Sequence, residues 1–221
     1  MMEEKKATKE KIIISAIKLF NEKGTYVIST NHIAKEAGIS PGNLYYYFKN
    51  KEEIIREIYE KMVKEFENIW ENPYYKIHIT EVWKGVATHF CIYYRYRFFM
   101  SEIVSLIKND FKLKKRYIEI KKERTKELKK LFINYKDKEV LKKEISDEQI
   151  EEIIEILWFM GEFWIMKSEF KENFEKESKN IELERYLKAI YAICKSYFKE
   201  EVLDGFLFEE KIKEIIVEAR L

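Results

Sequence analysis

The sequence predicts an all-α protein, and its composition leads to this fold class. Among 221 residues there are only 6 glycines and 2 prolines, so turns are few and the elements between them must be long. Hydrophobic residues make up 46% of the chain and charged residues 37%, a balance typical of helices with one buried and one solvated face. No segment shows the strict apolar–polar alternation that would indicate a strand.

The first 70 residues predict four helices whose ends carry clear signals. Apolar residues recur at helical spacing in four segments, 8–23, 30–37, 41–48 and about 50–70. Gly24 and Gly38 follow the first and second helices, where a residue with positive φ commonly ends a helix. Ser40 and Pro41 favour the start of the third helix, and Asn50 is placed to cap the fourth.

Pro73, preceded by Asn72, is the clearest helix break in the chain, because proline disfavours helical backbone in the residue before it. Ser146 and Gln149 have the spacing of a capping box at the start of a later helix. Beyond the break, helical spacing of apolar residues predicts helices over 77–94, 97–108, 111–135, 147–171, 181–200 and 206–219.

The segments 30–37 and 41–48 are joined by a tight turn and together predict a helix-turn-helix unit. Gly38 permits the positive φ angle that such a turn requires. Ala34 and Ala37 are small enough to let the two helices approach closely. The second of these helices is therefore expected to be held with its N-terminal end pointing outward.

The stretch from Ile13 to Ile55 resembles the DNA-binding domain of TetR-type transcriptional regulators. The residues that carry the resemblance are Ala16, Phe20, Gly24, Ile33, Ala34, Ala37, Gly38, Ile39, Ser40, Gly42, Leu44, Tyr45, Phe48, Lys51 and Glu52. The resemblance implies a helix-turn-helix DNA-binding domain over 1–51 and a larger helical ligand-sensing and dimerisation domain over 52–221, connected by a helix over 51–71. The larger part matches only in being helical and of suitable length.

By this resemblance, the helix from Pro41 to Phe48 enters the major groove of a DNA duplex. Asn43 is the best candidate for a base contact, because an amide can form two hydrogen bonds with adenine. Lys51 is expected to attract a phosphate. Tyr45 is expected to contact DNA, with burial in the core as the alternative. The expected DNA-binding residues are Thr30, Asn31, Ser40, Pro41, Gly42, Asn43, Tyr45, Tyr46, Tyr47 and Lys51.

The charge distribution agrees with DNA binding at the N-terminal end. Residues 1–51 contain nine lysines and five glutamates, a surplus of four positive charges in a chain whose net charge is +2. Two cysteines allow no disulfide framework, and neither a secretion signal nor a membrane-spanning apolar run is evident. We therefore expect a cytoplasmic protein.

Two helices of the larger part, 147–171 and 181–200, are apolar on more than one face. In the TetR family, two helices near the C-terminus form the four-helix bundle of a homodimer. The resemblance thus implies a dimer interface that includes Leu157, Gly161, Trp164, Leu187, Ile190 and Cys194. A second stripe contains Ile156, Phe159 and Phe163. The alternative is that both helices are buried within one subunit.

Aromatic side chains concentrate in 83–100 and 158–166 and could line an apolar pocket for a hydrophobic or aromatic small molecule. The expected lining residues are Trp83, Phe90, Tyr94, Phe98, Trp158 and Phe163. Ordinary core packing is the alternative for each of them. His89, Arg95 and Arg97 are candidate polar anchors for such a ligand.

These features together predict a ligand-responsive transcriptional repressor that binds operator DNA as a homodimer. The alternative is a dimeric helical protein-interaction module without DNA reading. The sequence contains no phosphate-binding glycine loop and no nucleophile motif, so we expect no enzyme. We also expect no cofactor and no metal, because its three histidines have no metal-binding spacing.

Overall fold

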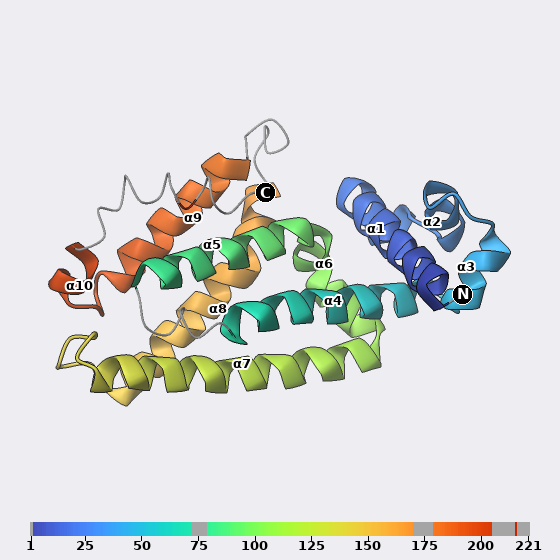
Figure 1. Ribbon diagram of the computed structural model, residues 1–221. Helices are drawn as coiled ribbons and strands as arrows, with labels where there is room; N and C mark the ends of the chain where they lie inside the picture. The colour runs from blue at the N-terminus through green and yellow to red at the C-terminus, as the bar shows by residue number, and fades with distance from the viewer. Residues whose placement is uncertain (1, 72–78, 170–178, 205–214, 216–221) are drawn as a thin grey trace. The chain divides into compact units, whose positions relative to one another are not determined.

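The computed structural model describes residues 2–71, 79–169, 179–204 and 215. The predicted all-α class is confirmed, because nearly all of these residues lie in helices (Figure 1). The helices are α1 (Met2–Val27), α2 (Thr30–Glu36), α3 (Pro41–Tyr47), α4 (Lys51–Glu71), α5 (Ile79–Arg95), α6 (Arg97–Asn109), α7 (Phe111–Asp137), α8 (Asp147–Glu169), α9 (Lys179–Cys194) and α10 (Glu200–Asp204).

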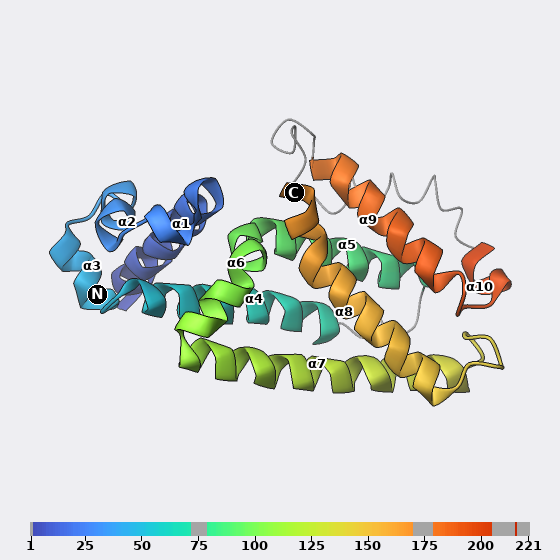
Figure 2. The same ribbon diagram turned by 180° about the vertical axis from the view of Figure 1, so that it is seen from behind.

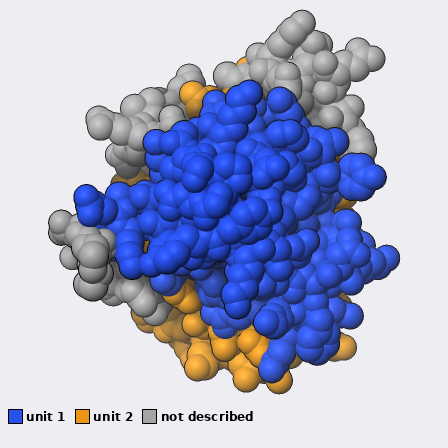
Figure 3. Space-filling model, turned by 90° about the vertical axis from the view of Figure 1, so that its right-hand side faces the viewer, with its two compact units in different colours: residues 1–65, 95–117 blue, residues 66–94, 118–221 orange. Residues whose placement is uncertain are grey.

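The chain forms two compact units, which are coloured separately in Figure 3. Unit 1 contains residues 1–65 and 95–117, and unit 2 contains residues 66–94 and 118–221. This division differs from the expected boundary after residue 51. It differs because α6 packs against α1 and because α4 is shared between the two units.

Unit 1 is built around the apolar face of α1. Ile12 and Phe20 on this face are almost completely buried, together with Ile33 of α2 and Leu44 of α3. Phe98 of α6 lies against Phe20, with ring centroids 5.1 Å apart. Burial of a side chain of this size stabilises a fold by about 1.5–3 kcal/mol, so α1 unites the helix-turn-helix with α6.

Ion pairs at the edges of α1 reinforce this packing. Lys18 pairs with Glu36 of α2 at 2.6 Å, and Lys9 pairs with Glu57 of α4 at the same distance. These pairs are partly exposed, so each contributes little stability by itself. They link α1 to α2 and to α4 beside the apolar face.

In unit 2, α8 and α9 lie side by side (Figure 2). Ile150 and Ile153 of α8 and Leu183 and Leu187 of α9 are each at most 1% exposed. The predicted capping box starts α8 as expected. The Ser146 hydroxyl accepts from the Gln149 amide at 3.2 Å, and the Gln149 side chain accepts from the Ser146 amide at 3.0 Å.

The predicted helix over 181–200 was too long, because α9 ends at Cys194. The chain then turns so that Phe198 forms an isolated antiparallel bridge with Leu141. The Phe198 ring packs against Phe132 and Tyr135, at centroid distances of 6.3 and 6.0 Å. This distant aromatic contact lies just beyond the end of α9, and no local sequence signal reports it. The predicted helix over 206–219 lies almost entirely outside the described residues.

Candidate nucleic-acid interface

The turn between α2 and α3 is closed by backbone hydrogen bonds. The Gly38 amide donates to the Lys35 carbonyl at 3.1 Å, and the Ile39 amide donates to the Ala34 carbonyl at 3.0 Å. Gly38 has a φ of 64°, in the left-handed region that favours glycine. Ala34 and Ala37 are completely buried, as the close approach of α2 and α3 requires.

Both short helices of the unit are capped at their N-terminal ends. The Ser40 hydroxyl accepts from the Asn43 amide at 3.2 Å, and Pro41 occupies the first turn of α3. At α2, the Ser29 hydroxyl accepts from the His32 amide, while His32 Nδ1 accepts from the Ser29 amide. The usual sequence signal of a capping box is absent here, because histidine replaces glutamate or glutamine at the third helical position.

The outer face of α3 carries three large polar side chains. Asn43 is exposed, and Tyr45 and Tyr46 are 50% and 65% exposed. Leu44 and Phe48 point the other way and are buried. Alternation of this kind on a helix of seven residues leaves Asn43 and the two phenols available to an external partner.

Each of these phenols already has a polar neighbour. The Tyr45 hydroxyl lies 2.9 Å from the Thr30 hydroxyl on α2. The Lys5 ammonium donates to the Tyr46 hydroxyl at 2.7 Å, and this hydrogen bond raises the pKa of Lys5. The sequence analysis did not single out Lys5, because only the tertiary fold brings the start of α1 beside α3.

The remaining predicted residues of this face have different surroundings. Asn31 is exposed, and Thr30 and Tyr47 are partly buried. Gly42 is exposed as well, and a Cβ atom added there would have no neighbour within 4 Å. The chain itself therefore gives no steric reason for a glycine at this position.

Lys51 does not point freely into solvent. Its ammonium donates to the Thr25 carbonyl and to the Ile28 carbonyl, the latter at 3.0 Å. These carbonyls follow the end of the apolar face of α1, so Lys51 ties the start of α4 to the segment before α2. This position argues against the expected phosphate contact, since two of its three N–H donors are used within the protein.

The residues predicted to line a ligand pocket are divided between the two units. Phe98 is a buried residue of unit 1 that packs against Phe20, and its part in a ligand pocket stays a prediction. The other five belong to unit 2. Among these, Trp83 and Phe90 are buried core residues, while Tyr94, Trp158 and Phe163 are partly exposed.

The three candidate polar anchors are divided in the same way. Arg95 and Arg97 lie in unit 1, where Arg95 pairs with Glu65. His89 lies in unit 2, with its ring 4.9 Å from that of Phe66. Burial lowers the pKa of His89 to about 4, and the positive charge of Arg124 adds to the effect. His89 is therefore neutral at pH 7 and stands in an aromatic environment.

The predicted dimer residues mostly face the protein's own interior. Leu187, Ile190 and Cys194 are at most 8% exposed, and burial raises the pKa of the Cys194 thiol to about 12. A Cβ atom at Gly161 would lie 3.0 Å from the Tyr93 ring, so this glycine admits α5 rather than a second subunit. These four residues pack within one chain here, and their part in a dimer interface stays a prediction.

Leu157 and Trp164, the other two predicted dimer residues, are partly buried, and the Trp164 ring contacts Tyr186 of α9. The second stripe of α8 is the one that faces outward. Phe159 is 62% exposed and Ile156 is 40% exposed, and the Phe159 ring stacks on Phe163 at 5.0 Å. The predicted dimer contacts of Leu157 and Trp164 stay a prediction, while the second stripe is the more exposed one in this chain.

Two further properties concern only the parts of the chain that the structure describes. No three histidine, cysteine or acidic side chains are grouped there in a way that could hold a metal ion. None of the helices there combines the length and the apolar character that crossing a membrane would require.

Two protein-family models match the chain. The model described as bacterial regulatory proteins of the tetR family matches residues 12–58, which include α2 and α3. The model described as a bacterial transcriptional repressor of the TetR type matches residues 58–206, about two thirds of the chain. The two matches meet within α4 and together reach from the helix-turn-helix to α10.

Curated relatives are similar over the N-terminal part. A probable HTH-type transcriptional regulator of Bacillus subtilis, YttP, is 42% identical over 72 residues, which are 31% of this chain and 35% of that protein. The fatty acid metabolism regulator protein of the same species is 34% identical over 65 residues, 29% of this chain and 34% of that protein. The chain thus spans about a third of the length of the curated relatives that it matches.

Solved structures share the fold over nearly the whole chain. A TetR-family transcriptional regulator from Marinobacter aquaeolei has a TM-score of 0.72 and 24% identity, covering 96% of this chain and 98% of that one. A γ-butyrolactone receptor has a TM-score of 0.68 and 12% identity with the same coverage. These likenesses show the shared fold, and the family models show that the chain belongs to the tetR family of bacterial transcriptional regulators.

Proposed function

We propose that the protein is a ligand-responsive repressor that binds operator DNA sequence-specifically through α3. The observation that supports this most directly is the exposure of Asn43 and Tyr46 on a short helix whose opposite side, at Leu44, is completely buried. A helix fixed in this way can enter a major groove without changing its own packing. Its outward side chains then meet the base edges.

Within this proposal, the exposed residues have separate roles. Asn43 reads a base, because its amide can pair with the donor and the acceptor that adenine presents. The Tyr45 and Thr30 hydroxyls, held 2.9 Å apart, bind one phosphate, and Asn31, Tyr46 and Tyr47 contact the backbone beside it. Ser40 and Pro41 set the start of α3, and the open space at Gly42 lets the duplex approach the backbone. Lys51 positions α4 instead of binding phosphate.

We further propose that the protein acts as a homodimer joined through the outer stripe of α8, Ile156, Phe159 and Phe163. A single short recognition helix contacts few base pairs, whereas a twofold dimer reads two half-sites about 34–36 Å apart. The effector would be a hydrophobic or aromatic small molecule bound in the aromatic interior of unit 2. Relatives named for fatty acid metabolism and for γ-butyrolactone fit an apolar effector. We propose that such a regulator acts in the cytoplasm and that it is not an enzyme.

The experiment that tests this proposal is a selection of duplexes from a random-sequence library by the purified full-length chain. Recovery of a two-half-site sequence, followed by salt-dependent gel-shift binding, is the expected result. The alternative function is a dimeric protein-interaction module. It would be favoured if the selection produced no enriched sequence although the protein remained dimeric and folded.

A further inference from the structure

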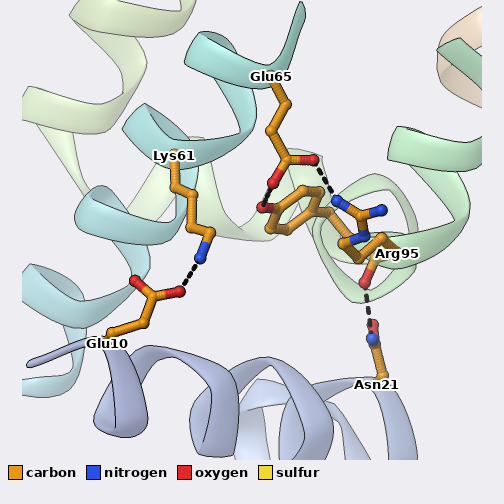
Figure 4. Close-up of polar contacts among 6 residues, drawn as sticks. Glu10, Asn21, Lys61, Glu65 and Arg95 are labelled. Atoms are coloured by element: carbon orange, nitrogen blue, oxygen red, sulfur yellow. Dashed lines mark hydrogen bonds and ion pairs between the residues drawn. The ribbon is translucent and has the colours of Figure 1, made fainter. Parts of the chain in front are cut away.

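A single amide side chain of α1 joins the ends of two other helices. The Asn21 Nδ2 atom donates to the carbonyl of Arg95, the last residue of α5, at 2.8 Å. Its Oδ1 atom accepts from the amide of Phe98, near the start of α6, at 3.1 Å. Figure 4 shows the amide of Asn21 pointing from α1 toward Arg95. All of these atoms belong to unit 1.

The junction between α5 and α6 needs such an external partner. Helix ends leave backbone donors and acceptors unsatisfied, and a side chain at the N-cap usually supplies one missing bond. The N-cap residue of α6 is Tyr96, whose side chain forms no capping bond. Asn21 therefore caps α6 from a different helix and satisfies a C-terminal carbonyl of α5 with the same group.

The junction is also held from α4. The Tyr96 ring is completely buried, and its hydroxyl donates to Glu65 at 2.7 Å. The same carboxylate pairs with Arg95, as Figure 4 shows. Burial is the main cause that raises the pKa of Tyr96, and the hydrogen bond to Glu65 raises it further. The junction is thus held on both sides, by Asn21 of α1 and by Glu65 of α4.

From Asn21 the connection continues to the DNA-binding face. One turn along α1, the Thr25 amide donates to Glu102 of α6 at 2.8 Å, and the Thr25 hydroxyl donates to the same carboxylate. The Thr25 carbonyl accepts from Lys51 of α4. At the same end of α1, Gly24 has a φ of 76°, which lets the backbone bend towards α2. A shift of α1 therefore reaches the segment that leads into the helix-turn-helix.

We propose that Asn21 is a positioning residue that couples the α5–α6 junction to the helix-turn-helix. An amide is flat and rigid, so it can keep both bonds only while the Arg95 carbonyl and the Phe98 amide hold their present spacing. A change at the end of α5 must then either break one of the bonds or move α1. This inference rests on the proposed DNA-binding function and adds the route by which the rest of the chain affects it.

Two substitutions separate this coupling from simple stabilisation. Asn21→Ala removes both bonds. Asn21→Asp keeps an acceptor for the Phe98 amide, and its charge suits the N-terminus of α6, but it cannot donate to the Arg95 carbonyl. Asn21→Asp should therefore keep the cap of α6 while losing the link to α5, because its second carboxylate oxygen is repelled by the Arg95 carbonyl. Asn68→Ala is the matched control, because Asn68 is an exposed asparagine on helix α4.

The measurement is hydrogen–deuterium exchange of the full chain, with and without a duplex selected by the wild-type protein. In the wild type and in Asn68→Ala, saturating duplex should slow exchange in residues 41–47 and, by about tenfold, in residues 97–100. In Asn21→Ala and Asn21→Asp, protection of 41–47 should persist while the effect on 97–100 is lost.

Two results would overturn the inference while leaving DNA binding intact. One is wild-type protein in which duplex protects 41–47 but has no effect on 97–100. The other is Asn21→Asp protein whose response at 97–100 equals that of the wild type. Absence of protection at 41–47 in the wild type would be recognisable as a failure of the proposed function itself, and the inference would fail with it.

Discussion

Two short stretches of this protein expose large side chains, but their surroundings differ. On α3, the hydroxyls of Tyr45 and Tyr46 lie within hydrogen-bonding distance of Thr30 and Lys5. On α8, the exposed Phe159 ring stacks on another apolar ring, that of Phe163. The first surface fits the polar partner that we propose, a sugar–phosphate backbone, and the second fits the apolar partner that we propose, a second subunit. Exposure alone therefore says less than the neighbours of the exposed group.

Placing a charge on the α8 surface should have the largest effect. If Phe159 is buried against a second subunit, Phe159→Asp buries an unpaired carboxylate and should weaken dimerisation a hundredfold or more, equivalent to about 3–5 kcal/mol. Sedimentation equilibrium measures this directly. Glu155→Ala, at an exposed position on the same helix, is the control and should leave the dimer intact. A Phe159→Asp protein that stays dimeric at low micromolar concentration would show that the subunits meet elsewhere.

On the polar surface, Asn43→Ala should remove a base contact without harming the fold. We expect specific DNA binding to weaken by about 1–3 kcal/mol and discrimination at one base position to disappear. Gel shifts with the selected duplex and with single-base variants of it provide the measurement. Lys49→Ala is a suitable control, because Lys49 is exposed just beyond α3. Equal losses at every base position would instead assign Asn43 to the phosphate backbone.

His89 tests the interior of unit 2 through the pH dependence of its stability. Its pKa is about 4 in the folded protein against an ordinary value of 6.5, so the unfolded chain takes up a proton first as the pH falls. Stability should therefore decrease between pH 7.5 and pH 5, by about 1–2 kcal/mol. His89→Phe should flatten this part of the profile in chemical denaturation measured at each pH. An unchanged slope in the variant would show that other groups cause the dependence.

The smallest expected effect is that of Gly42→Ala, which should raise the stability of the fold but weaken DNA binding. Gly42→Ala adds a methyl group in open space within α3, so it should stabilise the free protein by about 0.5–1 kcal/mol. If the duplex lies against this backbone, the same methyl group should weaken DNA binding. Thermal denaturation and gel shifts on one preparation compare the two. A variant that is more stable and binds DNA as well as the wild type would remove Gly42 from the interface.

The local signals of the first 50 residues predicted the helix-turn-helix closely. Gly38, Ser40 and Pro41 act within two or three residues of themselves, through φ preference and capping, so their consequences can be inferred without a fold. The same holds for the capping box of Ser146 and Gln149. The exposed positions on α3 then follow from which side of the helix carries Leu44.

The sequence could not foresee the surroundings of groups whose partners are distant in the sequence. Lys51 carries a charge that suits a phosphate ligand, yet its ammonium donates to two carbonyls that lie more than twenty residues earlier in the chain. Periodicity revealed two apolar stripes on α8, but it contains no information about which stripe faces α5. Only the contact of Gly161 with Tyr93 decides this.

The sequence by itself determined the helical class, the helix-turn-helix and the family, because these depend on short-range backbone preferences and on a pattern of residues within one segment. The tertiary structure alone decided that Phe98 belongs to the core of unit 1, that Phe198 packs against Phe132 beyond the end of α9, and that Asn21 bonds the ends of two other helices. Each of these depends on a contact between residues more than fifty positions apart. Such contacts arise from packing of the whole chain, and no local preference encodes them.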